Sequence, residues 1–79
     1  MNATIKTMEL IHADNLNPGQ LMLEDLIDVE GNIVEVVGIT DSNNGDDYHI
    51  EIVNDFGERE VVDFKYSDLI PLYVYIETE

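Results

Sequence analysis

The sequence predicts an all-β fold, a small antiparallel barrel of five to seven short strands. Stretches rich in β-branched and aromatic residues recur at spacings of about 8–12 residues, which is typical of small barrels and sandwiches. Clusters of Gly, Asn, Asp and Pro separate these stretches. With 79 residues and no internal repeat or linker, the chain is expected to form one domain spanning residues 1–79.

The clearest strand is residues 32–40 (NIVEVVGIT), which we expect at the centre of the sheet. Turn residues bound it, with Glu30-Gly31 before it and the polar stretch 41–47 after it. Strict alternation makes both of its faces apolar, because Ile33, Val37 and Ile39 lie on one face and Val34 and Val36 on the other.

A small barrel has only one interior, so the second apolar face of this strand requires a cover. The N-terminal strand, the segment 20–30 or another chain are the three alternatives. The last alternative predicts a homodimer or a bound partner at this strand.

Four further stretches are predicted as strands, and alternation assigns their inward residues. Residues 4–12 form the first strand, with neither face cleanly polar. Residues 48–53 place Tyr48, Ile50 and Ile52 inward, and residues 59–64 place Val62 and Phe64 on one face. Residues 72–76 close the domain with Leu72, Val74 and Ile76 inside.

Glycines predict the tight connections between these strands. Gly31 allows a tight hairpin into the central strand, and Gly57 is expected as the left-handed residue of a hairpin loop after residue 53. Residues 66–71 form a short connector with one 3₁₀ turn that ends at Pro71.

Residues 17–29 admit two interpretations. The favoured one is a type II turn at Pro18-Gly19, followed by one bent strand or two short strands over 21–29 with the bend at Glu24-Asp25. The alternative is a short helix around residues 20–27, with Asn17 as N-cap and Pro18 in the first helical position.

The order of these features resembles a small SH3-like β-barrel of the kind found in short phage-encoded proteins. The resemblance covers residues 14–76 and rests on turn and strand order, carried by the segments 16–19, 28–32, 33–39 and 67–71. It implies the fold and an origin in a phage or another mobile element, and it transfers no functional residue. The chain has no tryptophan, so the aromatic peptide groove of classical SH3 domains is not expected.

Charge is the strongest functional signal. Eighteen Asp and Glu face three Lys and Arg, a formal net charge of −15, whereas a magnitude of about 2–8 keeps a small domain soluble. Direct binding to nucleic acid or to an anionic membrane is therefore excluded. The absence of cysteine, of a signal peptide and of a long apolar run predicts a cytoplasmic protein, in the host cell if it is phage-encoded.

No motif predicts an enzyme, a metal site or a cofactor. The loop 41–47 fails as a calcium loop because Asp46 stands where glycine is required and Ile52 where the bidentate glutamate belongs. His12 and His49 are far apart in sequence and have no third ligand at a suitable spacing.

The predicted function is a non-enzymatic inhibitor that mimics nucleic-acid charge and blocks a basic, nucleic-acid-binding protein, the strategy of anti-CRISPR and anti-restriction proteins. In a strand, residues i and i+2 lie about 6.6–7 Å apart on one face, close to the repeat of phosphates. Asp28 with Glu30, and Glu58 with Glu60, have this spacing. The candidate partner-binding residues are Glu24, Asp25, Asp28, Glu30, Asp46, Asp47, Glu58, Glu60 and the outward tyrosines Tyr73 and Tyr75.

Two other functions remain as alternatives. The first is a small β-barrel adaptor or accessory module that binds a protein partner. The second is a small-ligand-binding barrel.

Overall fold

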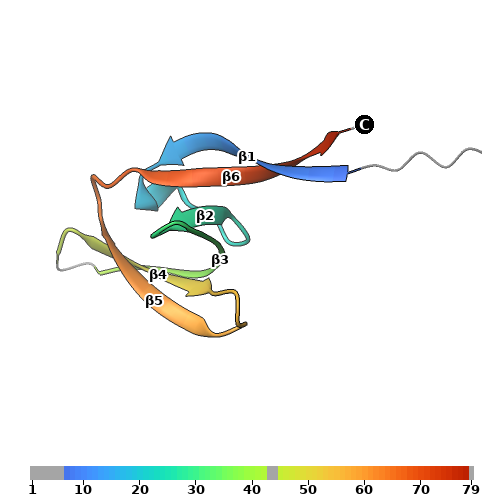
Figure 1. The fold of residues 1–79 in the computed structure, drawn as a ribbon. Coiled ribbons are helices and arrows are strands. Elements are labelled where there is room, and N and C mark those ends of the chain that lie inside the picture. Colours follow the sequence, from blue (N-terminus) through green and yellow to red (C-terminus); the bar gives the residue numbers. More distant parts are fainter. Residues whose placement is uncertain (1–6, 43–44, 79) are drawn as a thin grey trace, which may run out of the picture.

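The computed structural model describes residues 7–42 and 45–78, which form one antiparallel sheet of six strands (Figure 1). The sheet order is β1-β6-β2-β3-β4-β5, so β1 and β5 are its two edges. This confirms the all-β prediction. The elements are β1 (Thr7–Leu16), the 3₁₀ turn η1 (Pro18–Gln20), β2 (Leu26–Val29), β3 (Asn32–Asp41), β4 (Asp47–Val53), β5 (Arg59–Lys65) and β6 (Ile70–Thr78).

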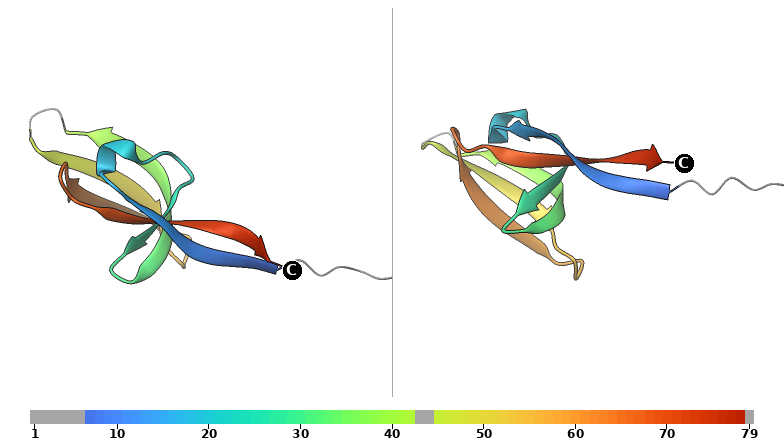
Figure 2. Two further views of the ribbon diagram at one scale, coloured as in Figure 1. Left: turned by 90° about the horizontal axis from the view of Figure 1, so that it is seen from above. Right: turned by 45° about the horizontal axis from the view of Figure 1, so that its top comes forward.

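One face of the sheet encloses a small aliphatic core, and the arrangement is consistent with a barrel-like fold. In Figure 2 the β1–β6 pair crosses the other strands at an angle instead of continuing them as a flat sheet. The buried core residues are Leu21, Ile27, Val34, Val36, Ile50, Ile52 and Ile70. On β4 and β5 the predicted inward residues are confirmed, since Ile50 and Ile52 are buried and Tyr48, Val62 and Phe64 pack against them.

A β-bulge in β3 explains why the sequence of this strand shows apolar residues on both alternating faces. Val36 lies opposite Ile52 and Ile39 opposite Ile50, with a register shift between Val36 and Gly38. The extra residue reverses the alternation, so Val36 and Ile39 both face the core although they are three residues apart. The expected need for a cover on the second apolar face assumed unbroken alternation along β3. The bulge breaks this alternation, so that need no longer follows.

Gly38 suits the bulge because the strands approach closely there. A Cβ atom at this position would lie 3.1 Å from the Cβ of Glu51, tighter than ordinary van der Waals contact.

Residues 17–25 combine both interpretations of the sequence. Asn17 is the N-cap of η1, and its backbone N–H donates to the Gln20 side chain as in a capping box, but the helix ends after a single 3₁₀ turn. Pro18-Gly19 therefore forms a 3₁₀ turn and not a type II turn. Only Leu26–Val29 of the predicted strand over 21–29 is a strand, and Glu24 makes the bend with a φ of 76°.

Both hairpin predictions are confirmed. Val29 pairs with Asn32 across a two-residue turn in which Glu30 and Gly31 have φ of 54° and 87°, the left-handed pair of a type I′ turn. Gly57, with φ of 77°, is the left-handed residue of the β4–β5 loop.

Beyond the body, β1 and β6 continue as a two-stranded arm. The last β2–β6 pair is Leu26 with Tyr73, whereas β1 and β6 remain paired out to Thr7 and Thr78. Leu72 packs against the core, but Val74 and Ile76 are each 38% exposed because nothing in the described part of the chain covers them. The prediction that both are inside is therefore wrong.

We expect Gly31→Ala to destabilise the protein by about 1 kcal/mol, because alanine disfavours the left-handed conformation. A Cβ at Gly31 would meet no atom within 4 Å, so the cost is conformational and not steric. Urea denaturation measures the change. Gly31→Asn is the control, since asparagine tolerates this conformation; an equal loss in both variants would contradict the assignment.

Candidate functional site

The candidate site is a pocket of about 260 Å³ at one end of the core, between the β2–β3 turn and the β4–β5 loop. Its floor is apolar and is formed by Val29, Val34 and Ile52, which belong to the core or pack against it. We call it the hairpin pocket, and its remaining lining residues are Glu30, Asn32, Asn54, Asp55, Phe56 and Glu60.

Strand register opens this end of the barrel. The first half of β3 pairs with β2, and its pairing with β4 begins only at Glu35, which lies opposite Val53. Residues 32–34 thus have no β4 neighbour, and the space beside them is the pocket. The opposite end of β4 is covered, because Gly19 of η1 lies against the ring of Tyr48.

At the pocket, the inward-facing positions of β5 and β3 carry polar side chains. Glu60 lies on β5, opposite the buried Ile52 of β4. Its side chain therefore faces the same side of the sheet as the core. Asn32 takes the first inward-facing position of β3, opposite Val29 of β2. The carboxylate of Glu60 therefore stands directly beside apolar side chains.

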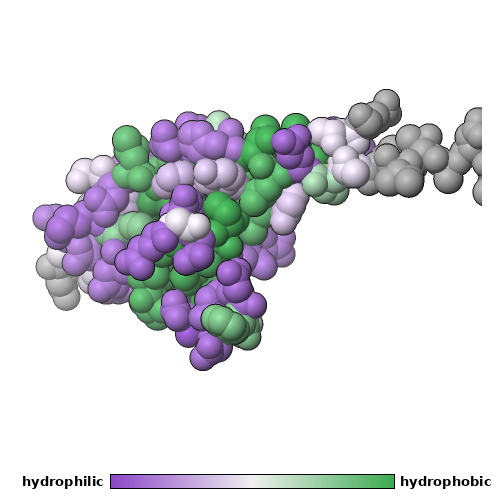
Figure 3. Space-filling model, viewed as in Figure 1, coloured by the Kyte–Doolittle hydropathy of each residue, from purple (hydrophilic) through white to green (hydrophobic). Residues whose placement is uncertain are grey.

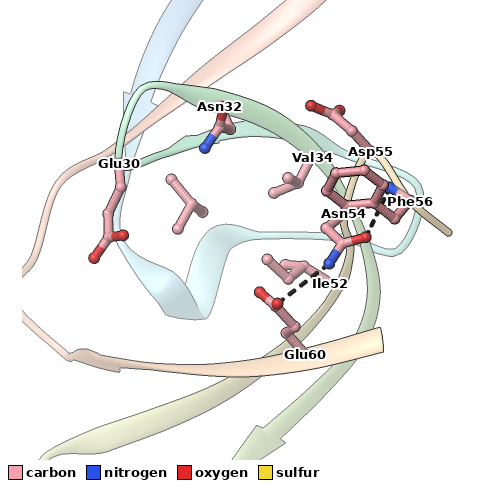
Figure 4. A pocket seen from close by; sticks show the side chains of 9 residues that line it. Glu30, Asn32, Val34, Ile52, Asn54, Asp55, Phe56 and Glu60 are labelled. Atoms are coloured by element: carbon pink, nitrogen blue, oxygen red, sulfur yellow. Dashed lines mark hydrogen bonds between the residues drawn. The ribbon is translucent and has the colours of Figure 1, made fainter. Parts of the chain in front are cut away.

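Asn54 fixes the loop that forms one wall of the pocket. Its Oδ1 accepts hydrogen bonds from the backbone N–H groups of Phe56 (2.9 Å) and Glu58 (3.1 Å). Its Nδ2 donates to the Glu60 carboxylate at 3.2 Å. The bonds to Phe56 and Glu60 are dashed in Figure 4, where Glu30 lies on one side of the pocket, Asp55 and Phe56 on the opposite side, and Glu60 between them beside Ile52.

Two of the predicted partner-binding residues, Glu30 and Glu60, meet at this pocket, but not through strand spacing. Glu30 lies in the β2–β3 turn, and Glu58 precedes the first residue of β5. The phosphate-like repeat predicted for Asp28 with Glu30 and for Glu58 with Glu60 is therefore wrong. Asp28 instead accepts a hydrogen bond from the Gly31 N–H at 2.8 Å and holds the turn.

The other predicted carboxylates lie away from the pocket lining. Glu24 is exposed at the bend, and Asp25 accepts a hydrogen bond from the Met22 N–H at 2.8 Å. Asp46 is exposed just before β4, and Asp47 at the start of β4 pairs with Lys65 at 3.5 Å. Asn43 and Asn44 of the predicted polar loop lie outside the described residues.

Tyr73 and Tyr75 lie on the same face of β6, as predicted, but in different surroundings. Tyr73 is half-buried, and its ring centroid is 5.6 Å from that of His12. Tyr75 is 57% exposed on the arm, opposite Leu10. Hydrophobic residues, green in Figure 3, cover part of this arm and alternate with hydrophilic ones.

Two charge pairs and one histidine–carboxylate contact lie on the outer face of the β4–β5 hairpin. Arg59 contacts Glu51 at 2.9 Å, and Lys65 contacts Asp47 at 3.5 Å. His49 Nδ1 lies 2.5 Å from the Asp63 carboxylate. Both basic residues of the described chain are thus already paired, and the third basic residue of the sequence, Lys6, lies outside it.

The two histidines have separate partners. His12 Nε2 lies 3.0 Å from Asn15 Oδ1, and His49 lies against Asp63. Among residues 7–42 and 45–78, no three His, Asp or Glu side chains are grouped to hold a metal ion. The same residues contain no helix long and apolar enough to cross a membrane.

A second polar cluster lies at the loop before β4. Tyr66 donates a hydrogen bond of 2.5 Å to Asp41, and its ring packs 4.9 Å from that of Tyr48. The hydrogen bond to Asp41, burial and the negative charges nearby raise the pKa of Tyr66 to about 12.

Sequence reasoning missed Asn32, Asn54, Asp55 and Phe56. Two signals were present: Asn54 stands at the start of a predicted hairpin loop, where asparagine commonly binds its own backbone, and Glu60 shares the alternation of Val62 and Phe64. Alternation within a strand could not show that residues 32–34 of β3 have no neighbour on β4.

Comparison with protein-family models, curated proteins and solved structures gives no match for this chain.

We expect Tyr66 to titrate with a midpoint near pH 12. The folded-state pKa exceeds the ordinary value of 10.0, so the hydrogen bond stabilises the fold fully below pH 10 and is lost as pH rises towards 12. The near-ultraviolet phenolate absorbance of the protein minus that of Tyr66→Phe isolates this group. Asp41→Asn should move the midpoint down towards 10, and an unchanged midpoint would contradict the role of Asp41.

Proposed function

We propose that this protein is a non-enzymatic inhibitor that presents an acidic surface to a basic, nucleic-acid-binding protein and competes with nucleic acid for it. The carrying observation is the uncompensated negative charge. The described basic residues are both committed to the outer face of the β4–β5 hairpin, while carboxylates line the hairpin pocket and the turns. A phage origin and an SH3-like barrel belong to this proposal as its evolutionary setting.

Charge placement supports occlusion by a surface of defined shape. Glu30, Glu58 and Glu60 come from two hairpin ends whose residues line the hairpin pocket; Glu30 and Glu60 are lining residues themselves, and Glu58 is exposed in the adjoining loop. Such a surface attracts a Lys- and Arg-rich groove at long range and accelerates association. Because nucleic acid binds the same groove by the same forces, the two ligands compete.

The test is affinity capture of proteins from a host-cell lysate on the immobilised protein, with increasing concentrations of duplex DNA as competitor. Nucleic-acid-binding proteins should be retained at about 50 mM salt and released by DNA. For about three charge contacts, the affinity should fall on the order of 10- to 100-fold between about 50 and 200 mM salt. Replacing Glu30, Glu58 and Glu60 by glutamine should abolish the retention.

A matched variant separates this site from total charge. Glu9, Glu35 and Glu77 are exposed, do not line the pocket and are not among the candidate partner-binding residues, and their replacement by glutamine removes the same charge. This control should retain the captured proteins. Equal loss in both variants, or retention that DNA leaves unchanged, would refute charge mimicry at the hairpin ends.

The apolar arm favours a second candidate function, an adaptor that docks on a protein partner. Met8 is 56% exposed and lies next to Leu10 on the face that also carries Tyr75. The outer edge of β1 is unpaired in the described sheet, and such edges bind added strands.

If the arm docks a partner, Met8→Ser with Tyr75→Ser should abolish binding that persists at high salt, because apolar contacts are not screened. Val61→Ser is the control, since Val61 is 63% exposed on β5, at the opposite edge of the sheet. Light scattering distinguishes a homodimer from a heterologous partner. Unchanged binding by the double variant would exclude the arm.

A further inference from the structure

The hairpin pocket combines an apolar floor with carboxylates in its lining. Val34 and Ile52, both buried, form the floor, and Glu60 rises beside them on β5. Its volume, about 260 Å³, is below the roughly 300–1,000 Å³ of pockets that hold drug-sized ligands or cofactors. The space therefore suits one long side chain or a small amine.

Charge decides which ligand fits. No Lys or Arg lines the pocket, so the charged side chains that an anion would meet are all carboxylates, those of Glu30, Asp55 and Glu60. An uncharged apolar ligand would remove water from the Glu60 carboxylate without replacing its hydrogen bonds. A cation on an aliphatic stem satisfies both parts, because the stem packs on the floor and the charged head reaches the carboxylates.

We infer that the hairpin pocket binds an arginine side chain of a basic polypeptide. This inference rests on the proposed function and names the contact that the basic partner makes. A guanidinium is planar and donates in a fork, a geometry that suits carboxylates such as those of Glu30 and Glu60, which both line the pocket. An ammonium group is a point charge and bridges two carboxylates less well.

The rim indicates a polypeptide as the source of the guanidinium. Phe56 is 86% exposed at the tip of the β4–β5 loop, and Asp55 lies beside it. The Phe56 ring provides a face for residues flanking the inserted arginine, or for a second cation. A free guanidine would leave this apolar surface unused.

The experiment is a methyl NMR titration of the whole protein with the peptide acetyl-Gly-Gly-Arg-Gly-Gly-amide. The methyl groups of Val29, Val34 and Ile52 should shift saturably. The citrulline peptide, equal in shape and uncharged, should not shift them, and the lysine peptide should bind several-fold more weakly.

Two charge-matched variants make the test specific. Glu60→Gln retains an oxygen that accepts from Asn54, so the loop should stay folded, and it should weaken the arginine peptide about tenfold. Glu35→Gln removes the same charge from an exposed residue of β3 outside the pocket and should leave the affinity within about twofold.

Two outcomes would overturn the inference. If both variants weaken binding equally and the floor methyl groups do not shift, the attraction is diffuse; the proposed function would survive and the pocket assignment would fail. If agmatine binds as tightly as the peptide, or the peptide does not bind, the arginine of a polypeptide is not the ligand. The DNA competition described above then tests the proposed function independently.

Discussion

The bulge in β3 is the constraint on which the rest of the structure depends. Without the extra residue near Val37, either Val36 or Ile39 would leave the core, because residues three apart fall on opposite faces of a regular strand. The bulge also shifts the β3–β4 register by one residue, and the last residue of β4, Val53, lies opposite Glu35.

Much of the fold follows from local sequence patterns. Where the structure departs from these patterns, the cause is pairing between strands that are far apart in the sequence. Gly31 and Gly57 marked their turns because only certain residues adopt the left-handed conformation without strain. Alternation assigned β4 and β5 because both are regular and paired along their full length. Alternation also gave Val74 the face of Leu72, but burial depends on where β2 begins, at Leu26, which no local pattern in β6 encodes.

The candidate site was predictable only in part. Glu30 and Glu60 were two of eight candidate carboxylates, and the spacing argument treated each cluster as a separate strand. Their meeting is a tertiary effect, since one lies in the β2–β3 turn and the other on β5. Phe56 carried no sequence signal, because an apolar residue in a hairpin loop becomes meaningful only once a hollow is seen beside it.

The placement of the Arg59–Glu51 and Lys65–Asp47 pairs has a further consequence. Exposed pairs of this kind add little to folding free energy. Their effect is to offset carboxylates on the outer face of the β4–β5 hairpin, because Arg59 and Lys65 are the only Lys and Arg of the described residues. Most of the uncompensated negative charge of these residues therefore lies on other surfaces, and a positively charged molecule is attracted more strongly to those surfaces.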